Sequence, residues 1–207
     1  MSHVAGFHFF KHHPHAELEE ALAKASQPKL TKPVGREKQQ KFGILDAPIL
    51  LKSDLHSEPG VLGRVVIYFD LDNFKLINTR FSERVVDECV LPVIQPSVAA
   101  AVSSHGYAYA EGGDEMVVFL QNSTLDMGAA FADALRQALA ETTIDVRGEP
   151  LAITASFGVS AEADGYKAAD AANLAKNFAK QDGKNCVAVS LGGRFELWRR
   201  SGAGSKA

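Results

Sequence analysis

Two carboxylates follow a pair of glycines in the segment Gly112-Gly113-Asp114-Glu115. Apolar residues flank this segment at 107–109 and 117–120, so the pattern predicts a β-hairpin whose tip carries the two acids. Glycines let a bulky ligand approach the backbone, and adjacent carboxylates suit a hard cation such as Mg²⁺. A solvated turn has the same composition, so the tip alone indicates a functional site only weakly.

A second acidic segment, Asp70-Leu71-Asp72, follows the apolar run at 65–69. Five consecutive apolar residues are typical of a strand that is buried on both faces. A neighbouring hairpin can present a further acid beside the end of such a strand. The two segments together therefore predict a two-cation site for phosphoryl transfer.

The bulk composition permits an enzyme and excludes some other classes. The chain has 207 residues, 46% of them hydrophobic, and a formal charge of −3, which fits one globular domain with an extension. This charge argues against a nucleic-acid binder that relies on a basic surface. Cys89 and Cys186 have no nearby cysteine and lie in apolar runs, so we expect buried free thiols in a reducing compartment.

The sequence also bears on the location of the protein. No apolar run reaches the roughly 18 residues of a membrane span, and the histidine-rich start lacks the apolar core of a signal peptide. We therefore expect a cytoplasmic protein without membrane contact.

Residues 1–61 differ in composition from the rest of the chain. We expect a short helix over 16–25, a basic linker over 29–41 and, over 44–51, a segment that docks on the main domain. The five histidines between His3 and His15 lack the spacing of metal ligands, and a solvated end is the favoured interpretation. The predicted organisation is an N-terminal extension (1–61), a main domain (62–191) and a partly disordered C-terminal tail (192–207).

The main domain shows a regular alternation of strand and helix patterns. The expected elements are a strand at 65–69, a helix from 74 to 101 that is interrupted near 80–82 and kinked at Pro92 and Pro96, a hairpin at 107–120, a helix at 126–140, a strand at 151–159, a helix at 168–181 and a strand at 185–189. This order predicts an α+β fold of the ferredoxin-like βαββαβ type with an additional helix and strand. Its central, mostly antiparallel sheet is flanked by helices.

At this point the residues resemble a known family. Residues 62–191 are similar to the GGDEF domain of diguanylate cyclases, which join two GTP molecules into cyclic di-GMP and release pyrophosphate. The matching segments stand in the family's order at 70–78, 112–116, 156–159 and 179–185. The resemblance implies a nucleotidyltransferase with the palm fold of nucleotide cyclases. Because no sensor domain is recognisable, we expect a divergent member of the family.

The resemblance also implies roles for individual residues. Asp70 and Asp114, with the main-chain carbonyl of Leu71, would hold Mg²⁺ or Mn²⁺, and Glu115 would complete the catalytic group by adding negative charge. The phosphates would lie against the hairpin glycines, Gly112 and Gly113, and against backbone amides at a turn from strand to helix, where unpaired N–H groups favour anions. The residues that supply these amides would be Asn73, Phe74 and Lys75.

Lys180 and Lys184 are the expected cationic partners of the phosphates. They are four residues apart, which predicts that they lie one helical turn from each other and reach the same phosphates. Members of the family commonly have arginine at the second position, and Lys184 keeps the charge without the bidentate fork. Two lysines at a helix end also suit the helix dipole without any ligand.

Asn78 and Asp87 occupy the positions at which the family recognises guanine. A carboxylate can accept from the N1–H and N2–H₂ groups of guanine, and adenine does not match that pattern, so the resemblance favours GTP. The intervening loop departs from the family, which usually has Asn-Asp-x-x-Gly-His-x-x-Gly-Asp where this chain has Asn-Thr-Arg-Phe-Ser-Glu-Arg-Val-Val-Asp over 78–87.

A product that contains two nucleotides implies a homodimer, which we expect to be transient, and residues 1–61 are the expected contact for a regulatory protein. Two other functions stay open. One is a synthase of cyclic oligonucleotides from ATP or mixed nucleotides, resembling the palm polymerases of CRISPR complexes in phage defence. The other is a catalytically silent module that binds a nucleotide and signals to a partner. The intact acids at Asp70, Asp114 and Glu115 argue against the silent module.

Overall fold

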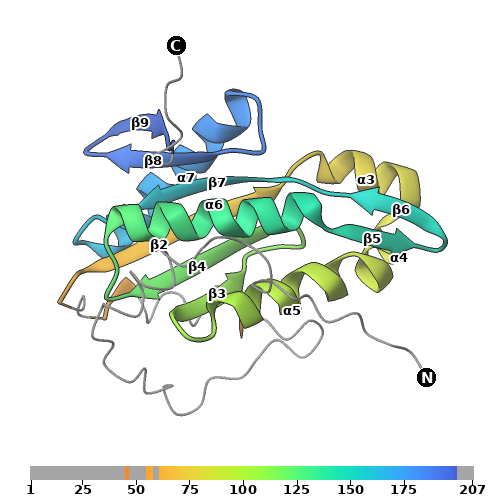
Figure 1. Cartoon of the computed structure of the whole chain (residues 1–207), viewed down its shortest axis with the longest axis horizontal. Helices are drawn as coiled ribbons and strands as arrows, with labels where there is room; N and C mark the ends of the chain where they lie inside the picture. The colour runs from red at the N-terminus through yellow and green to blue at the C-terminus, as the bar shows by residue number, and fades with distance from the viewer. Residues whose placement is uncertain (1–44, 47–54, 58–60, 200–207) are drawn as a thin grey trace, which may run out of the picture.

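A seven-stranded sheet forms the centre of the computed structural model, which describes residues 45–46, 55–57 and 61–199 (Figure 1). The strands are β1 (Leu45–Asp46), β2 (Arg64–Leu71), β3 (Gly106–Ala110), β4 (Glu115–Gln121), β5 (Thr143–Val146), β6 (Glu149–Ala152), β7 (Ala155–Ser160), β8 (Val187–Leu191) and β9 (Arg194–Leu197). The helices are α3 (Phe74–Phe81), α4 (Glu83–Cys89), α5 (Leu91–Val102), α6 (Leu125–Glu141) and α7 (Gly165–Gln181).

The order of strands in the sheet is β1-β3-β4-β2-β7-β8-β9. Strand β2 lies in the middle and pairs antiparallel with both β4 and β7, whereas β1 with β3 and β7 with β8 are parallel pairs. The predicted α+β fold with its ferredoxin-like order of elements is confirmed, and β2 and β4 bring the two acidic segments to the same end of the sheet.

Strand β2 is buried on both faces, as its apolar sequence predicts. Ile67 and Phe69 belong to the larger core, which α5 and α6 cover, and Phe69 stacks on Phe157 with ring centroids 4.7 Å apart. Tyr68 belongs to a smaller core beneath α7 on the opposite face. This helix lies very close to the sheet at Gly158, where an added Cβ would come within 2.0 Å of the Ala172 carbonyl oxygen. The end of β2 is therefore fixed from both sides.

The long helical stretch after β2 breaks into three helices. The predicted interruption near 80–82 is confirmed, because Ser82 separates α3 from α4 with φ 72° and ψ 150°. A second break falls at Val90, directly before the helix that has Pro92 in its first turn. Pro96 lies inside α5. The break at Ser82 sets the angle between the two helices that carry Asn78 and Asp87.

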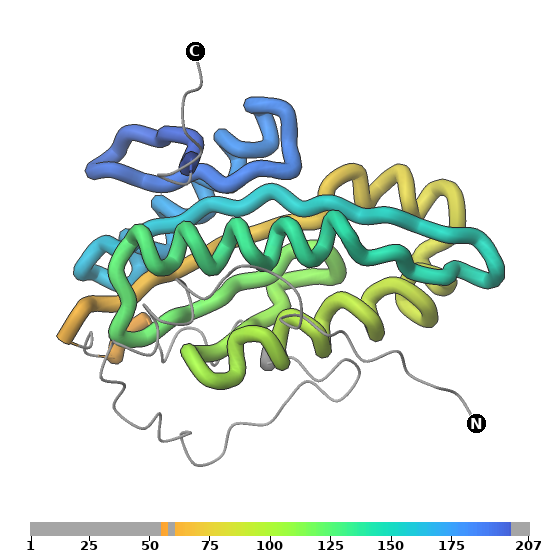
Figure 2. The backbone as a smooth tube through the Cα atoms, in the orientation of Figure 1, coloured from red at the N-terminus to blue at the C-terminus, as the bar shows by residue number. Residues whose placement is uncertain are grey.

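The single strand expected over 151–159 is wrong. Strands β6 and β7 are separate, and β6 pairs with β5 in a two-stranded hairpin that extends past the end of the main sheet (Figure 2). The turn at Arg147 and Gly148 has positive φ at both residues, which matches the right-handed twist of the two strands. Two exposed ion pairs, Arg147 with Glu88 and Arg80 with Glu149, link the hairpin to α4 and α3.

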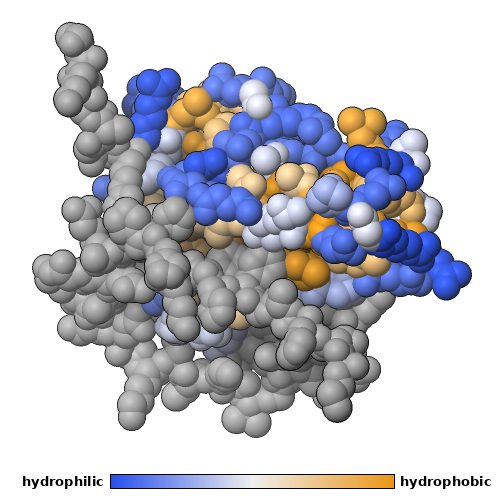
Figure 3. Space-filling model, turned by 45° about the vertical axis from the view of Figure 1, so that its right-hand side comes forward, coloured by the Kyte–Doolittle hydropathy of each residue, from blue (hydrophilic) through white to orange (hydrophobic). Residues whose placement is uncertain are grey.

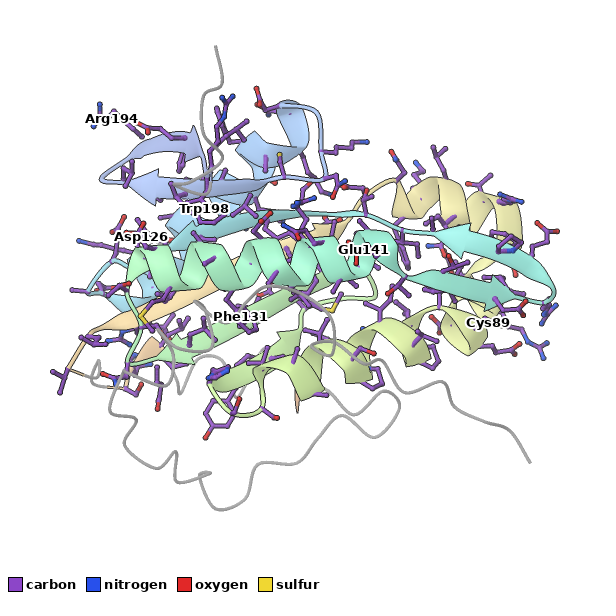
Figure 4. The ribbon with its side chains drawn as sticks, in the orientation of Figure 1. Cys89, Asp126, Phe131, Glu141, Arg194 and Trp198 are labelled. Carbon is purple, nitrogen blue, oxygen red and sulfur yellow. The ribbon has the colours of Figure 1, made fainter. Side chains whose placement is uncertain are left out.

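The sheet also continues beyond the expected closing strand. Strand β9, within the segment expected as the C-terminal tail, pairs antiparallel with β8 and forms one edge of the sheet. The Trp198 N–H then donates to the Val187 carbonyl at 2.9 Å, and its side chain packs against the larger core (Figure 4). Cys89 and Cys186 are free but only half-buried, which corrects the expectation of buried thiols.

Leu45 and Asp46 pair with Tyr109 and Ala110 at the opposite edge. The remainder of the segment expected to dock over 44–51, the helix over 16–25, the linker over 29–41 and the N-terminal histidines lie outside the described residues. Among the described residues, no single helix has the length and apolar character needed to cross a membrane. Only α4 and α5 taken together pass that test, and they are bent by 44° at their junction.

Candidate active site

The three predicted acids meet where β2 ends and β4 begins. Asp70 and Glu115 are directly opposite each other in the antiparallel register, so their side chains lie on the same face of the sheet. The Leu71 N–H donates to the Asp114 carbonyl at 3.1 Å, which fixes the backbone of the hairpin tip against the end of β2. The structure therefore brings together Asp70, Leu71, Asp114 and Glu115.

Asp72, the second acid of the Asp-x-Asp segment, does not belong to this site. Its carboxylate is buried and accepts three hydrogen bonds, from the Thr154 and Ser156 hydroxyls at 2.7 Å each and from the Asn185 N–H at 3.0 Å. These bonds occupy the carboxylate and tie the turn after β2 to β7 and to the loop after α7. The two-cation site expected from this segment thus has only Asp70 at the end of β2.

A pocket of about 580 Å³ opens beside Asp114. Its volume lies within the range that small-molecule ligands occupy. Asn78 and Asp87, the predicted base-recognition residues, both line it, and the buried Asn78 Oδ1 has no hydrogen-bond partner. A buried acceptor without a donor is costly, so this atom suits a ligand that donates to it. The lining residues are Phe74, Lys75, Asn78, Thr79, Glu83, Asp87, Leu91, Gly113 and Asp114.

The hairpin tip forms one wall of this pocket. Gly113 lies 3.6 Å or more from the Phe74 ring and 3.5 Å from Leu91, measured from the position that a Cβ would take. Gln95, a buried residue of α5 that the sequence did not single out, donates from Nε2 to the Gly113 carbonyl at 3.3 Å. Gln95 therefore supports the tip from the side of α5. Gly112 has open space around it.

The start of α3 has the features of an anion site. Asn73 adopts a left-handed conformation with φ 58°, and no side chain caps the first turn of the helix. The N–H groups at the start of a helix favour anions when no side chain occupies them. Lys184 Nζ donates to Asn73 Oδ1 at 2.6 Å, and Lys180 Nζ lies 2.5 Å from Asp70 Oδ1. Lys180 and Lys184 thus lie beside the turn between β2 and α3, where the expected phosphate-binding amides are.

Lys184 does not lie one helical turn after Lys180, as the spacing predicted. Helix α7 ends at Gln181, and Lys184 follows Gly183 in a left-handed conformation with φ 66°. The glycine ends the helix because it readily adopts positive φ. Both lysines nevertheless point to the end of β2.

The pKa of Asp70 indicates whether a cation would be favourable between Asp70 and Asp114. Burial raises the pKa of Asp70, the Lys180 ammonium lowers it, and the nearby Asp114 raises it again, with a net upward shift. The second carboxylate therefore disfavours ionisation of the first, and a divalent cation would relieve this repulsion. No cluster of three or more metal-ligating side chains exists among the described residues. Two carboxylates, a carbonyl and phosphate oxygens are a normal environment for Mg²⁺, and the donors fit that ion.

Lys176 is a charged residue of this region that the sequence analysis missed. It lies on the buried face of α7, and its ammonium pairs with Glu115. The sequence contained an indication of this role. Lys176 is four residues before Lys180 and is the one charged side chain among alanines at buried positions of that helix.

Comparison with known proteins identifies the family. The family model described as "Diguanylate cyclase, GGDEF domain" matches residues 55–186. Diguanylate cyclase DgcP of Pseudomonas aeruginosa is 32% identical over 139 residues, which are 65% of this chain and 20% of that protein. A diguanylate cyclase of Vibrio cholerae is 33% identical over 126 residues, which are 58% of this chain and 37% of that protein. The chain thus spans well under half the length of these relatives.

Solved structures agree with this assignment. The active GGEEF domain of a diguanylate cyclase from Vibrio cholerae matches with a TM-score of 0.54 and 28% identity, over 61% of this chain and 81% of that one. Diguanylate cyclase SiaD of Pseudomonas aeruginosa, solved in complex with its activator SiaC, matches with a TM-score of 0.67 over 84% of this chain and 65% of that one. Its 22% identity shows the fold alone. The chain belongs to the GGDEF-domain family of diguanylate cyclases, which are nucleotidyltransferases.

Proposed function

We propose that this chain is a diguanylate cyclase that binds one GTP per domain and joins two GTP molecules into cyclic di-GMP. The observation that carries the proposal is the pocket of about 580 Å³ with Asn78 and Asp87 among its lining residues and with Asp114 and Gly113 in its wall. A nucleotide suits this arrangement, because groups that can read a base and groups that can hold a phosphate-bound cation share one cavity.

The proposed base is guanine. Asp87 would accept from the N1–H and N2–H₂ groups of guanine, and adenine has no such pair of donors on that edge. The unpartnered Asn78 Oδ1 offers a further acceptor, and the Asn78 amide can donate to a ring nitrogen. The chain keeps both residues in the pocket although the residues between them differ from the family motif.

The proposed phosphate and cation sites lie at the end of β2. Asp70, Asp114 and the Leu71 carbonyl would hold Mg²⁺ or Mn²⁺, and the backbone amides of Asn73, Phe74 and Lys75 would hold phosphate oxygens. When bound, the cation would neutralise phosphate charge and lower the pKa of the attacking hydroxyl. Lys180 and Lys184 border the same turn, where their ammonium groups can stabilise the negative charge of the triphosphate.

The reaction forms two phosphodiester bonds. The 3′-hydroxyl of each GTP loses its proton to solvent, and its oxygen bonds to the α-phosphorus of the other GTP. The bond from that phosphorus to the oxygen that bridges it to the β-phosphorus breaks, and each step releases one pyrophosphate. Since the proposal places one GTP in the pocket of each domain, two domains must face each other. The protein positions the reactants and stabilises charge, which is the main contribution of proteins to phosphoryl transfer.

The test is product analysis by mass spectrometry after purified protein is incubated with Mg²⁺ and an equal mixture of the four nucleoside triphosphates. We expect cyclic di-GMP from the wild-type protein and none from Asp114→Asn. Asp126→Asn is the matched control, because it makes the same change at an exposed residue in the first turn of α6, at the end of this helix opposite Glu141 (Figure 4). It should retain full activity.

The other functions predict different outcomes. A cyclic product that contains adenosine would overturn the base assignment and favour the synthase of cyclic oligonucleotides. Intact GTP that binds without reaction at high protein concentration would favour the silent module. Regulation by a protein that contacts residues 1–61 and a cytoplasmic location both stay predictions; the similar fold of SiaD was solved with an activator bound.

A further inference from the structure

Lys176 is a buried ammonium in a helix face that is otherwise made of small residues. Only 6% of its side chain is exposed, and the neighbouring buried positions of α7 include Ala172, Ala175 and Ala179. Burying a charge without a partner is strongly unfavourable, so a lysine here requires a carboxylate.

Glu115 is that carboxylate. Its Oε1 pairs with Lys176 Nζ, which also lies 5.9 Å from the centre of the Tyr68 ring. The Tyr68 hydroxyl donates to Glu111 Oε1 at 3.1 Å, which adds a second acid to the same polar group. One turn later along α7, Lys180 pairs with Asp70, the residue opposite Glu115 in the sheet.

The two acids of the hairpin therefore have different surroundings. Asp114 lines the pocket next to α3 and α4. Glu115 lies on the α7 face of the sheet, where the ammonium of Lys176 neutralises it. The Glu115 side chain is 30% exposed, and without Lys176 its carboxylate would lose this ion pair while it stays on the same face of the sheet as Asp70. It could then turn to a cation held by Asp70 and Asp114.

We infer that Lys176 is a positioning residue that holds Glu115 away from the cation, so that Asp70 and Asp114 supply the carboxylate ligands. The inference rests on the cation site of the proposed function. Lys176 thereby sets the number of protein ligands, and therefore the number of water molecules that stay on the metal.

The experiment counts the water ligands of bound Mn²⁺. Mn²⁺ is added to the full chain together with a GTP analogue that has a methylene group between its α and β phosphorus atoms and cannot release pyrophosphate, and EPR line broadening in ¹⁷O-enriched water reports the waters in the inner coordination sphere. We expect one water fewer in Lys176→Met than in the wild type, because the released Glu115 replaces it. Glu115→Gln and the double variant Lys176→Met/Glu115→Gln should both retain the wild-type number. Lys167→Met, a change to an exposed lysine near the start of α7, is the control for loss of one positive charge.

Each other outcome contradicts the inference. An unchanged water number in Lys176→Met would show that Lys176 does not hold Glu115 back. An additional water in Glu115→Gln would show that Glu115 is already a ligand, and this arm stands even if Lys176→Met does not fold. A wild-type chain that binds no Mn²⁺ would overturn the cation site of the proposed function as well, which separates that failure from failure of the inference alone.

Discussion

At the scale of the residue, Asp70 and Asp72 have identical side chains but different surroundings, and they therefore differ in role. Asp72 accepts three hydrogen bonds from groups that follow it by 82 to 113 residues, and it has no further access to a ligand. Asp70 has a raised pKa because it is buried and lies near Asp114, and the fold therefore disfavours its ionised form. One carboxylate supports the fold, whereas the other is the proposed ligand of the cation.

The same substitution at each aspartate should separate an effect on stability from an effect on cation binding. We expect Asp72→Asn to lower the free energy of unfolding by about 2–3 kcal/mol, because the carboxylate uses both oxygens to accept these hydrogen bonds and an amide has only one. Asp70→Asn should leave stability unchanged or raise it, since the raised pKa makes the ionised carboxylate unfavourable in the folded state at neutral pH. Urea unfolding measures stability, and Mn²⁺ titration should show loss of binding in Asp70→Asn only. A larger stability loss in Asp70→Asn than in Asp72→Asn would contradict this division.

At the scale of the element, the junction of α3 and α4 positions the proposed base-recognition residues. Ser82 has φ 72° and ψ 150°, a conformation that a residue with a side chain rarely adopts. The family motif has glycine at this position, so the backbone keeps the glycine conformation although the residue has changed. The Ser82 hydroxyl makes no capping hydrogen bond that would offset the strain.

Ser82→Gly should therefore stabilise the protein by about 1 kcal/mol, the relief of strain less the additional chain entropy of glycine in the unfolded state. This corresponds to a rise in Tm of about 2–4 °C for a chain of this size. Ser82→Ala is the control, because it removes the hydroxyl and keeps the strained backbone, and its Tm should stay near that of the wild type. A fall in Tm for Ser82→Gly would contradict the prediction that the backbone at Ser82 is strained, because the serine would then stabilise the folded state.

At the scale of the whole molecule, few large hydrophobic side chains are exposed among the described residues. The exposed large hydrophobic side chains come from the segment before β2 and from α3, α7 and β8, and on the face drawn in Figure 3 hydrophobic residues are interspersed with hydrophilic ones. The exposed large hydrophobic residues are Val61, Leu62, Leu76, Tyr166, Leu174 and Leu191. Stable interfaces usually bury a contiguous patch, so this small number of exposed apolar side chains agrees with the proposed transient dimer, in which the bound nucleotides would supply part of the contact.

The activity should consequently depend on protein concentration. Below the dissociation constant of the dimer, twofold dilution should halve the activity per mole of enzyme, because the population of dimers falls with the square of the concentration. Initial rates of pyrophosphate release over a dilution series measure this dependence. Excess Asp114→Asn protein should inhibit a fixed amount of wild type by forming mixed dimers. Specific activity that is independent of dilution, with no inhibition by the variant, would rule out a transient dimer.

The sequence by itself determined the elements and the chemical character of the site. Apolar runs and helical spacing are local properties, so they predicted β2, the β3–β4 hairpin, α6 and α7 within a few residues. The acids at the ends of β2 and the hairpin came together because antiparallel neighbours align strand ends. The β5–β6 hairpin was missed, since Leu151 to Val159 reads as one apolar run and its break at Ile153 and Thr154 has no strong turn signal.

Only the tertiary structure decided which charged residues face the proposed ligand. Lys176 looks like an ordinary helix lysine until α7 packs on the sheet and places it on Glu115, 61 residues earlier in the chain. Asp72 looks like a second metal ligand until β7 and the loop after α7 surround it. Pairing between distant segments depends on packing, which local patterns do not encode. The sequence thus specified which acids and lysines are available, and the fold determined which of them neutralise each other.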